Sequence, residues 1–383
     1  MTMKAVWIGS ALLCLAASAQ AVQDCELNGE GVNPSNGNTT AGKTGLMRCK
    51  DRDSGQMMRE QEIKNGKFMG LVRQYDAGKL KNEYSENDRG NRQGLYRSYG
   101  ADGKLLREET YDNGDNTGLS RSNWPGGQLR RVAFYVPPEG ERAHAEFTER
   151  GQLQSLRCGD KPMLAPLADD TRWCGFAGTP APVEFFGSRG VLTARSTYVA
   201  GKRMRHETFN DNGNPSYQAE ITEKTRVERY FNTAGVKRRE LTARPGSKGW
   251  SRDSELEFSD KGTLVRERRW ADDTLALDQT YYLNGQLRSK AEYTGTGAAA
   301  AMLTTDYYGS GKVAATGRFD VSRRNRELPV GSFLRFNEAG RVVGEATYDD
   351  KGSVNRERVW DDEGKLLRDD AVFEDGSRKA FAR

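Results

Sequence analysis

An internal repeat with a period of about two dozen residues constrains the fold of this chain more than any other feature. The dipeptide Gly-Leu opens the segments GLMRC, GLVRQY, GLYRSY and GLSRSN at Gly45, Gly70, Gly94 and Gly118, which are 25, 24 and 24 residues apart. A fixed period of this size is typical of a stacked array, because one unit cannot bury its apolar face alone and its neighbours must cover it.

A second pattern carries the repeat through the rest of the chain. An aromatic residue followed four positions later by glycine occurs 11 times, and most cases have Leu or Val two residues after the glycine. Glycine supplies the positive φ of a tight turn, and Asn or Asp before it also favours turns. The predicted turn glycines are Gly78, Gly103, Gly127, Gly262, Gly285, Gly340, Gly352 and Gly364. The predicted core aromatics are Tyr75, Tyr99, Tyr111, Phe258, Trp270, Tyr281, Phe336, Tyr348 and Trp360.

The segments between these turns favour strands over helices. They are short and rich in Tyr, Phe, Trp, Thr and Val, which suit a half-buried pleated surface. No long apolar stretch has the 3.6-residue period of a helix. We therefore predict an all-β fold, an elongated array of stacked two-stranded β-hairpins with little helix.

The segments GLYRSYGADGKL and YDDKGSVNRERVW resemble the bacterial MORN-variant repeat, found in proteins grouped as YwqK-type antitoxins. The resemblance is clearest over residues 45–135 and 331–373. It implies stacked hairpins and a binding role, with a toxin as one class of partner. It carries over no catalytic residue, because the repeat motif has none.

The N-terminus has the pattern of a secretory signal peptide over residues 1–21. Lys4 precedes an apolar stretch that runs to Ala17, and Ala19 and Ala21 form the small-residue cleavage pattern. We expect cleavage after Ala21 and a periplasmic or extracellular location, with lipidation of Cys14 and attachment to the outer membrane as the alternative. The stretch is shorter than the roughly 20 residues that span a bilayer.

Four cysteines remain after cleavage, and an exported chain favours disulfides. Four cysteines allow three pairings. We expect Cys25–Cys49 and Cys158–Cys174, since each pair is close in sequence and brackets an irregular segment. A zinc site is the disfavoured alternative, because no CxxC is present and His144 and His206 are the only histidines. We expect no metal and no cofactor.

The charge is mixed rather than strongly basic. A formal net charge of +5 with 30% charged residues argues against nucleic acid as a partner. Three basic clusters are ordinarily explained as solvent-facing strand residues balanced by Glu, and the functional alternative is a patch for an acidic protein or a phospholipid surface. Their members are Lys237, Arg238, Arg239, Arg266, Arg268, Arg269, Arg323, Arg324 and Arg326.

Composition divides the mature chain into four parts. Residues 22–44 are predicted to be an Asn/Gly-rich loop, and residues 45–158 and 184–383 to be two hairpin arrays. Residues 159–183 hold four of the 11 prolines and are predicted to be a disulfide-clipped insertion at the seam. Shorter breaks are expected at 243–250 and 294–301.

Residues that could carry catalysis have simpler explanations. The Asp pairs at 349–350 and 361–362 precede repeat glycines, where Asp is an ordinary turn residue. His144 and His206 lie in strand-like segments without a nucleophile nearby in the sequence. We predict a non-enzymatic exported protein that binds a protein partner, as an antitoxin or immunity protein. The alternatives are an envelope scaffold contacting lipid or peptidoglycan, and a hydrolase with a scattered carboxylate site.

Overall fold

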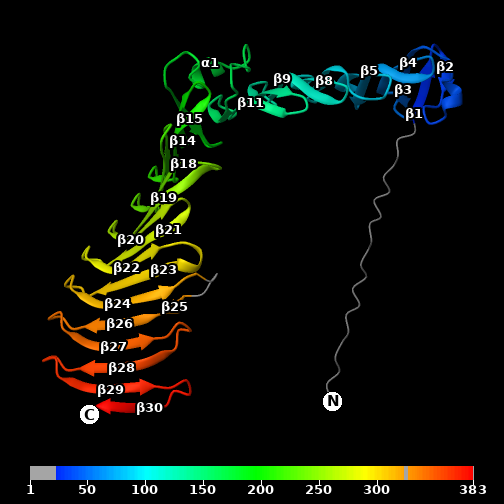
Figure 1. Cartoon of the computed structure of the whole chain (residues 1–383). Coiled ribbons are helices and arrows are strands. Elements are labelled where there is room, and N and C mark those ends of the chain that lie inside the picture. The colour runs from blue at the N-terminus through cyan, green and yellow to red at the C-terminus, as the bar shows by residue number, and fades with distance from the viewer. Residues whose placement is uncertain (1–22, 323–326, 383) are drawn as a thin grey trace, which may run out of the picture. The chain divides into compact units, whose positions relative to one another are not determined.

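The chain folds almost entirely into β-strands, arranged as two antiparallel sheets (Figure 1). The computed structural model describes residues 23–322 and 327–382 of the 383. The predicted signal peptide, Cys14 and the basic residues Arg323, Arg324 and Arg326 lie outside the described residues. No helix within the described ranges is long and apolar enough to cross a membrane.

The first sheet, called sheet 1 below, has 12 strands in the order β12-β11-β10-β9-β8-β7-β6-β5-β4-β3-β1-β2. Its strands are β1 (Gln23–Leu27), β2 (Glu30–Val32), β3 (Gly45–Asp51), β4 (Met57–Lys64), β5 (Lys67–Asp76), β6 (Lys79–Glu86), β7 (Gly94–Tyr99), β8 (Leu105–Asp112), β9 (Asp115–Asn123), β10 (Leu129–Val136), β11 (Gly140–Phe147) and β12 (Leu153–Arg157).

The second sheet, sheet 2, has 18 strands that follow one another in chain order. They are β13 (Ala181–Phe186), β14 (Leu192–Val199), β15 (Lys202–Phe209), β16 (Pro215–Ile221), β17 (Arg226–Phe231), β18 (Lys237–Gly246), β19 (Gly249–Phe258), β20 (Leu264–Ala271), β21 (Thr274–Tyr281), β22 (Leu287–Thr294), β23 (Ala301–Tyr307), β24 (Val313–Asp320), β25 (Leu328–Pro329), β26 (Gly331–Phe336), β27 (Val342–Tyr348), β28 (Val354–Trp360), β29 (Leu366–Val372) and β30 (Arg378–Ala382).

The recurring turn explains the aromatic-to-glycine spacing. All eight glycines predicted for turns have positive φ, between 75° and 98°. In the turn after β19, the Gly262 N–H donates to the Ser259 carbonyl oxygen at 2.9 Å, and the register shifts at Phe258. Phe258 therefore pairs directly with Leu264 on the next strand. The motif thus encodes a bulged hairpin in which an aromatic and an aliphatic side chain meet across the turn.

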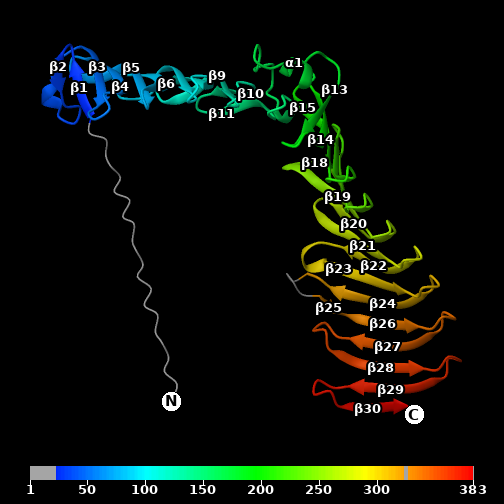
Figure 2. The ribbon, with the colours of Figure 1, turned by 180° about the vertical axis from the view of Figure 1, so that it is seen from behind.

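The hairpins form continuous sheets rather than separate two-stranded units, and the described part of sheet 2 has almost no buried core from β17 onward. Within each sheet, strands contact the strands beside them, and Figures 1 and 2 show β19 to β30 lying side by side. Between Arg226 and Ala382, the buried hydrophobic residues among those described are Ala301, Met302 and Leu328. The nine aromatics predicted to be core are each half-buried, because no second layer packs on them in the part of the chain that the structure describes.

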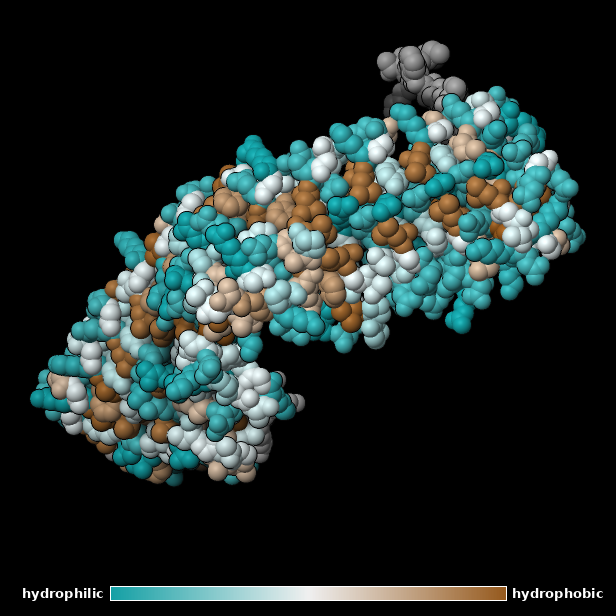
Figure 3. Space-filling model, turned by 90° about the horizontal axis from the view of Figure 1, so that it is seen from above, coloured by the Kyte–Doolittle hydropathy of each residue, from teal (hydrophilic) through white to brown (hydrophobic). Residues whose placement is uncertain are grey.

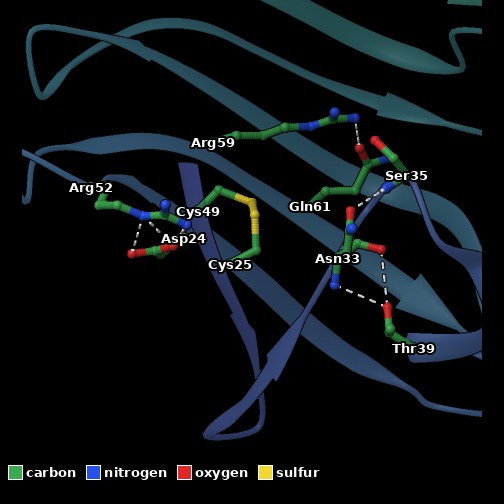
Figure 4. The surroundings of a disulfide bond; sticks show 9 residues. All are labelled: Asp24, Cys25, Asn33, Ser35, Thr39, Cys49, Arg52, Arg59 and Gln61. Carbon is green, nitrogen blue, oxygen red and sulfur yellow. Dashed lines mark hydrogen bonds and ion pairs between the residues drawn. A yellow bond between two sulfur atoms is a disulfide. The ribbon is translucent and has the colours of Figure 1, made fainter. Parts of the chain in front are cut away.

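The N-terminal segment differs from the predicted loop. Residues 22–44 contain β1 and β2 and a 3-10 turn, η1 (Gly37–Thr39). β1 pairs with β3, so that Cys25 lies opposite Cys49 and the two form a disulfide (Figure 4). The alternation in QDCEL buries Cys25 and Leu27 against Met47, and this pattern outweighs the Asn- and Gly-rich composition that suggested a loop.

Residues 159–183 lie between the last strand of sheet 1 and the first turn of sheet 2. β12 ends at Arg157 and β13 begins at Ala181, and the short helix α1 (Asp170–Trp173) is the one regular element between them in the described chain. Cys158 and Cys174 are also disulfide-bonded. The expected break at 243–250 is absent: β18 and β19 run through it as a hairpin with an exposed tip. The break at 294–301 holds a 3-10 turn, η2 (Gly297–Ala299).

Candidate binding surfaces

A ladder of alternating charges crosses one face of sheet 1. It has one member on each strand from β3 to β9, and directly opposed residues form six successive ion pairs. The members, with the distance to the next, are Arg48 (3.1 Å), Glu60 (3.4 Å), Arg73 (2.8 Å), Glu83 (3.9 Å), Arg97 (2.8 Å), Glu108 (3.1 Å) and Arg121.

The ladder gives the repeat a second physical role. Its arginines are the fourth residues of the four Gly-Leu-x-Arg segments, so the 24-residue period places one on every second strand. The glutamates fill the strands between. Their side chains are 11–23% exposed, and the arginines are 34–49% exposed. Each inner member bridges two opposite charges, and such networks contribute more than isolated surface pairs do.

The ladder was not identified in the sequence analysis. The recurring Arg three residues after each Gly was the available signal. What turned it into a ladder was the strand register, which places a glutamate opposite every one of those arginines.

Tyrosine hydroxyls recur as partners of half-buried or buried carboxylates. Tyr75 donates to Glu60 at 2.7 Å, Tyr111 to Glu109 at 2.8 Å and Tyr217 to Glu228 at 2.8 Å. Burial alone would raise the pKa of Glu60, but hydrogen bonds from Tyr75, Arg48 and Arg73 outweigh burial and lower that pKa. The carboxylate therefore stays ionised and keeps its place in the ladder.

The same contacts raise the pKa values of the tyrosines. Burial, followed by the hydrogen bond to Glu60, raises the pKa of Tyr75 to about 12. Burial and the bond to Glu228 raise the pKa of Tyr217 to about 12, and burial and Glu267 raise that of Tyr281 to about 12. These phenols remain neutral donors at any physiological pH.

The predicted basic patch is divided between faces and neutralised. Strand alternation puts Arg239, Arg266 and Arg268 on one face of sheet 2 and Arg269 on the other. All six described members have carboxylate partners. The pairs are Lys237–Glu240 (3.0 Å), Arg238–Asp260, Arg239–Glu255 (2.5 Å), Arg266–Asp278 (2.6 Å), Arg268–Glu257 (2.5 Å) and Arg269–Glu267 (2.6 Å).

The acidic side chains before the repeat glycines act as turn residues. Asp349 accepts the N–H groups of Lys351 and Ser353 at 2.9 and 2.8 Å, and Asp361 has the equivalent contacts in the next turn. Among the described residues, no three His, Cys, Asp or Glu side chains are grouped so as to hold a metal ion.

The two histidines have contacts that the sequence did not reveal. His144 Nδ1 lies 2.5 Å from a Glu141 oxygen, and its Nε2 lies 3.2 Å from Ser155 Oγ. A serine hydrolase triad has the same succession of carboxylate, histidine and serine. Ser155 Oγ also lies 3.0 Å from Glu146, which competes for its proton. These residues come from β11 and β12, so only strand pairing brings them together.

His206 has a simpler environment. Its Nδ1 lies 2.8 Å from Ser196 Oγ. Burial, and then the nearby Arg203 charge, lower the pKa of His206 and favour the neutral ring.

Apolar and polar side chains are mixed on the face of the molecule that Figure 3 shows. Figure 3 shows short apolar patches separated by polar side chains across the visible surface. The most exposed large apolar side chains are Leu283, at 75%, and Phe381, at 62%.

Comparisons with known proteins support the repeat. Residues 92–113 and 279–294 match the MORN repeat variant. They correspond to the β7–β8 hairpin and to most of the β21–β22 hairpin. A search of curated proteins returned no match.

Solved structures give only remote likenesses. The crystal structure of TcdB2-TccC3-Cdc42 is 13% identical over 93% of this chain and 19% of that chain, with a TM-score of 0.18. The Photorhabdus luminescens Tc holotoxin pore is 13% identical over 87% and 23%, also at 0.18. A 6-phosphogluconolactonase from Bacteroides uniformis is 14% identical over 88% and 91%, at 0.12. The chain spans about a fifth of the toxin-complex chains, and TM-scores this low carry no argument.

Proposed function

We propose that this protein is an exported, non-enzymatic repeat protein that binds a protein partner across an uncovered sheet face. The observation that carries the proposal is the near-absence of a buried core in the described part of sheet 2 from β17 onward, where the predicted core aromatics stay half-buried. A sheet face normally packs against another layer. Here a partner protein would supply that layer, and repeat sheets offer long, pre-formed surfaces for such binding.

Within this class we propose an antitoxin or immunity role. The support is the resemblance of the repeats to those of YwqK-type antitoxins, together with the signal-peptide pattern and the disulfides, which fit an oxidising compartment. The partner would then be a toxin that meets the protein after export. Loss of the gene should be harmful only when that toxin is present.

An affinity experiment tests the binding proposal. Residues 22–383, kept oxidised, are immobilised and exposed to the cell-envelope and secreted fractions of the source cell, and retained proteins are identified by mass spectrometry. We expect one stoichiometric protein that survives high salt. Retention of lipid or wall material alone, released by salt, would instead support an envelope scaffold. The ion pairing of all six described basic-cluster residues weighs against that alternative.

A second candidate function is hydrolysis at Ser155. The contacts from Glu141 to His144 to Ser155 favour it, with Ser155 as the nucleophile and His144 as the base. A fluorophosphonate probe tests it. Labelling of the parent chain that disappears in both Ser155→Ala and His144→Ala would establish a reactive serine, whereas an unlabelled parent chain would leave the cluster as a structural network.

A further inference from the structure

Three tyrosine rings in sheet 1 converge on a single guanidinium group. Tyr84, Tyr96 and Tyr111 lie on the adjacent strands β6, β7 and β8. The Cζ atom of Arg92 lies 5.2, 4.8 and 5.3 Å from their respective ring centroids. All three distances are within the roughly 6 Å at which a cation is attracted by an aromatic face. Arg92 comes from the connection between β6 and β7.

The rings are held in position by their own contacts. Tyr111 donates its hydroxyl proton to Glu109, which is only 2% exposed, and Tyr96 donates to the side-chain oxygen of Asn82 at 3.0 Å. The Tyr84 and Tyr96 centroids are 6.0 Å apart, and those of Tyr96 and Tyr111 are 6.2 Å apart. These contacts pre-organise the three rings for a cation. The hydrogen bond from the Tyr111 hydroxyl to the carboxylate also increases the electron density of the Tyr111 ring, which strengthens its attraction for a cation.

The repeat does not require this arrangement. Tyr96 is the third residue of its Gly-Leu-x-Arg segment, and the other three segments have Met47, Val72 and Ser120 there. Arg92 stands two residues before Gly94, where the other segments have Lys43, Phe68 and Asn116. A feature needed for the hairpin would recur in every repeat, but this cluster of three tyrosines and an arginine occurs in one of these four.

Arg92 itself is an exchangeable occupant. Its side chain is exposed, and its guanidinium group donates a hydrogen bond to the Tyr111 hydroxyl at 3.3 Å. Within the described residues it has no carboxylate at ion-pair distance, unlike the four ladder arginines. Rotation of the side chain would therefore expose the ring faces without breaking an ion pair.

We propose that Tyr84, Tyr96 and Tyr111 form a binding site for a guanidinium cation, occupied in the free chain by Arg92. The natural ligand we infer is an arginine side chain of the protein partner, which displaces Arg92 on binding. In this last respect the inference rests on the proposed partner binding. The site itself does not depend on that proposal, because its own arginine already occupies it.

The experiment uses acetylated, amidated arginine as the probe and residues 22–383 as the protein. Binding is measured by calorimetry and by the shifts of tyrosine ring signals. Arg92→Ala should bind the probe at least about tenfold more tightly than the parent chain, because the internal competitor is gone. Adding Tyr96→Ser should reverse this gain. Arg89→Ala, which removes another exposed arginine of the same connection, should bind like the parent.

Equal affinity of Arg92→Ala and the parent chain would overturn the proposal, as would a gain that survives Tyr96→Ser. Arg92→Lys guards against misfolding of the alanine variant, since it keeps a cation and should give intermediate affinity. Tighter binding of tetramethylammonium than of the arginine probe would overturn the assignment to guanidinium. Failure to capture any partner, with probe binding intact, would count against the proposed function but not against the site.

Discussion

Sheet 1 and sheet 2 are built from the same bulged hairpin but stabilised differently. In sheet 1, charges alternate without interruption from Arg48 to Arg121. A similar row crosses sheet 2 from Glu184, but Gln218, Leu256 and Gln279 interrupt it. There the charges gather instead around single carboxylates such as Glu255, which is 1% exposed. The repeat thus fixes the turn and the apolar pair across it, and leaves the charged positions free to differ.

The largest expected effect comes from removing the disulfide that ties β1 to β3 within sheet 1. Cys25→Ser with Cys49→Ser opens a loop with a sequence separation of 24, which we expect to destabilise sheet 1 by about 3 kcal/mol. Hydrogen exchange read by mass spectrometry should show faster exchange in β1 to β4. Faster exchange throughout sheet 2 would show that the sheets unfold together, contrary to the comparison.

Breaking the ladder at its least exposed member should cost nearly as much. Glu60→Gln removes the charge that Arg48, Arg73 and Tyr75 share, and we expect a loss of about 2 to 3 kcal/mol in the free energy of unfolding. The matched control is Glu184→Gln in sheet 2. That carboxylate is 51% exposed and pairs with Arg195 alone, so its loss should be below about 1 kcal/mol.

Equal losses for these two variants, measured by urea unfolding followed by circular dichroism, would contradict a special role for the ladder. They would mean that the alternating charges act as independent surface pairs.

A packing change should act in sheet 2 alone. A methyl group at Gly317 would collide with the Phe333 ring, which also packs 5.1 Å from Phe319 and 4.9 Å from Tyr348. We expect Gly317→Ala to destabilise β24 to β27 by about 1 to 2 kcal/mol through overpacking. Gly309→Ala, at a turn glycine whose φ is not positive and which has open space around it, is the control and should cost less. Thermal melts of Gly317→Ala and Gly309→Ala that cannot be distinguished would contradict overpacking at Gly317.

Alkaline pH should produce the smallest effect, and it should destabilise sheet 2 more than sheet 1. Unfolded tyrosine ionises near pH 10, and Tyr75, Tyr217 and Tyr281 have pKa values of about 12 in the folded chain. The stability that they contribute is therefore fully present below pH 10 and is lost as the pH rises to 12. Two of the three lie in sheet 2.

Phenylalanine at Tyr217 and Tyr281 should reduce that alkaline loss, while lowering stability at neutral pH by about 1 kcal/mol per hydrogen bond removed. The measurement is urea unfolding at pH 8 and pH 11. If the free energy of unfolding falls between pH 8 and pH 11 by the same amount in the variant and in the parent chain, these phenols do not control the alkaline loss of stability.

The parts of the fold that were predictable from sequence are those encoded locally. The turn glycines, the strand-rich segments between them and the Cys25–Cys49 pair follow from short-range patterns. The burial of the aromatics was not predictable in the same way. Phe258 and Trp270 are only half-buried, because burial depends on whether a second layer covers the sheet, and the repeat itself does not specify one.

The site residues show the same limit more strongly. The ladder required the register between strands, and the contact of Ser155 with His144 required the pairing of β11 with β12. The sequence left open whether Lys237 to Arg239 and Arg266 to Arg269 form a basic patch or are balanced by Glu. The structure pairs them with carboxylates such as Glu255, Glu257 and Asp278, which approach from neighbouring strands. Cross-strand partners are set by register, which composition does not report.

The most direct test of the account is side-chain footprinting of the free mature chain with hydroxyl radicals. An uncovered sheet 2 predicts that its half-buried Trp270, Tyr281 and Phe336 are oxidised readily, while Met47 in the core of sheet 1, at 0% exposure, is protected despite its more reactive sulfur. Addition of a captured partner should then protect the aromatics of one face. Protection of these aromatics in the free chain to the level of Met47 would mean that the faces are already covered, and would contradict the proposed mode of binding.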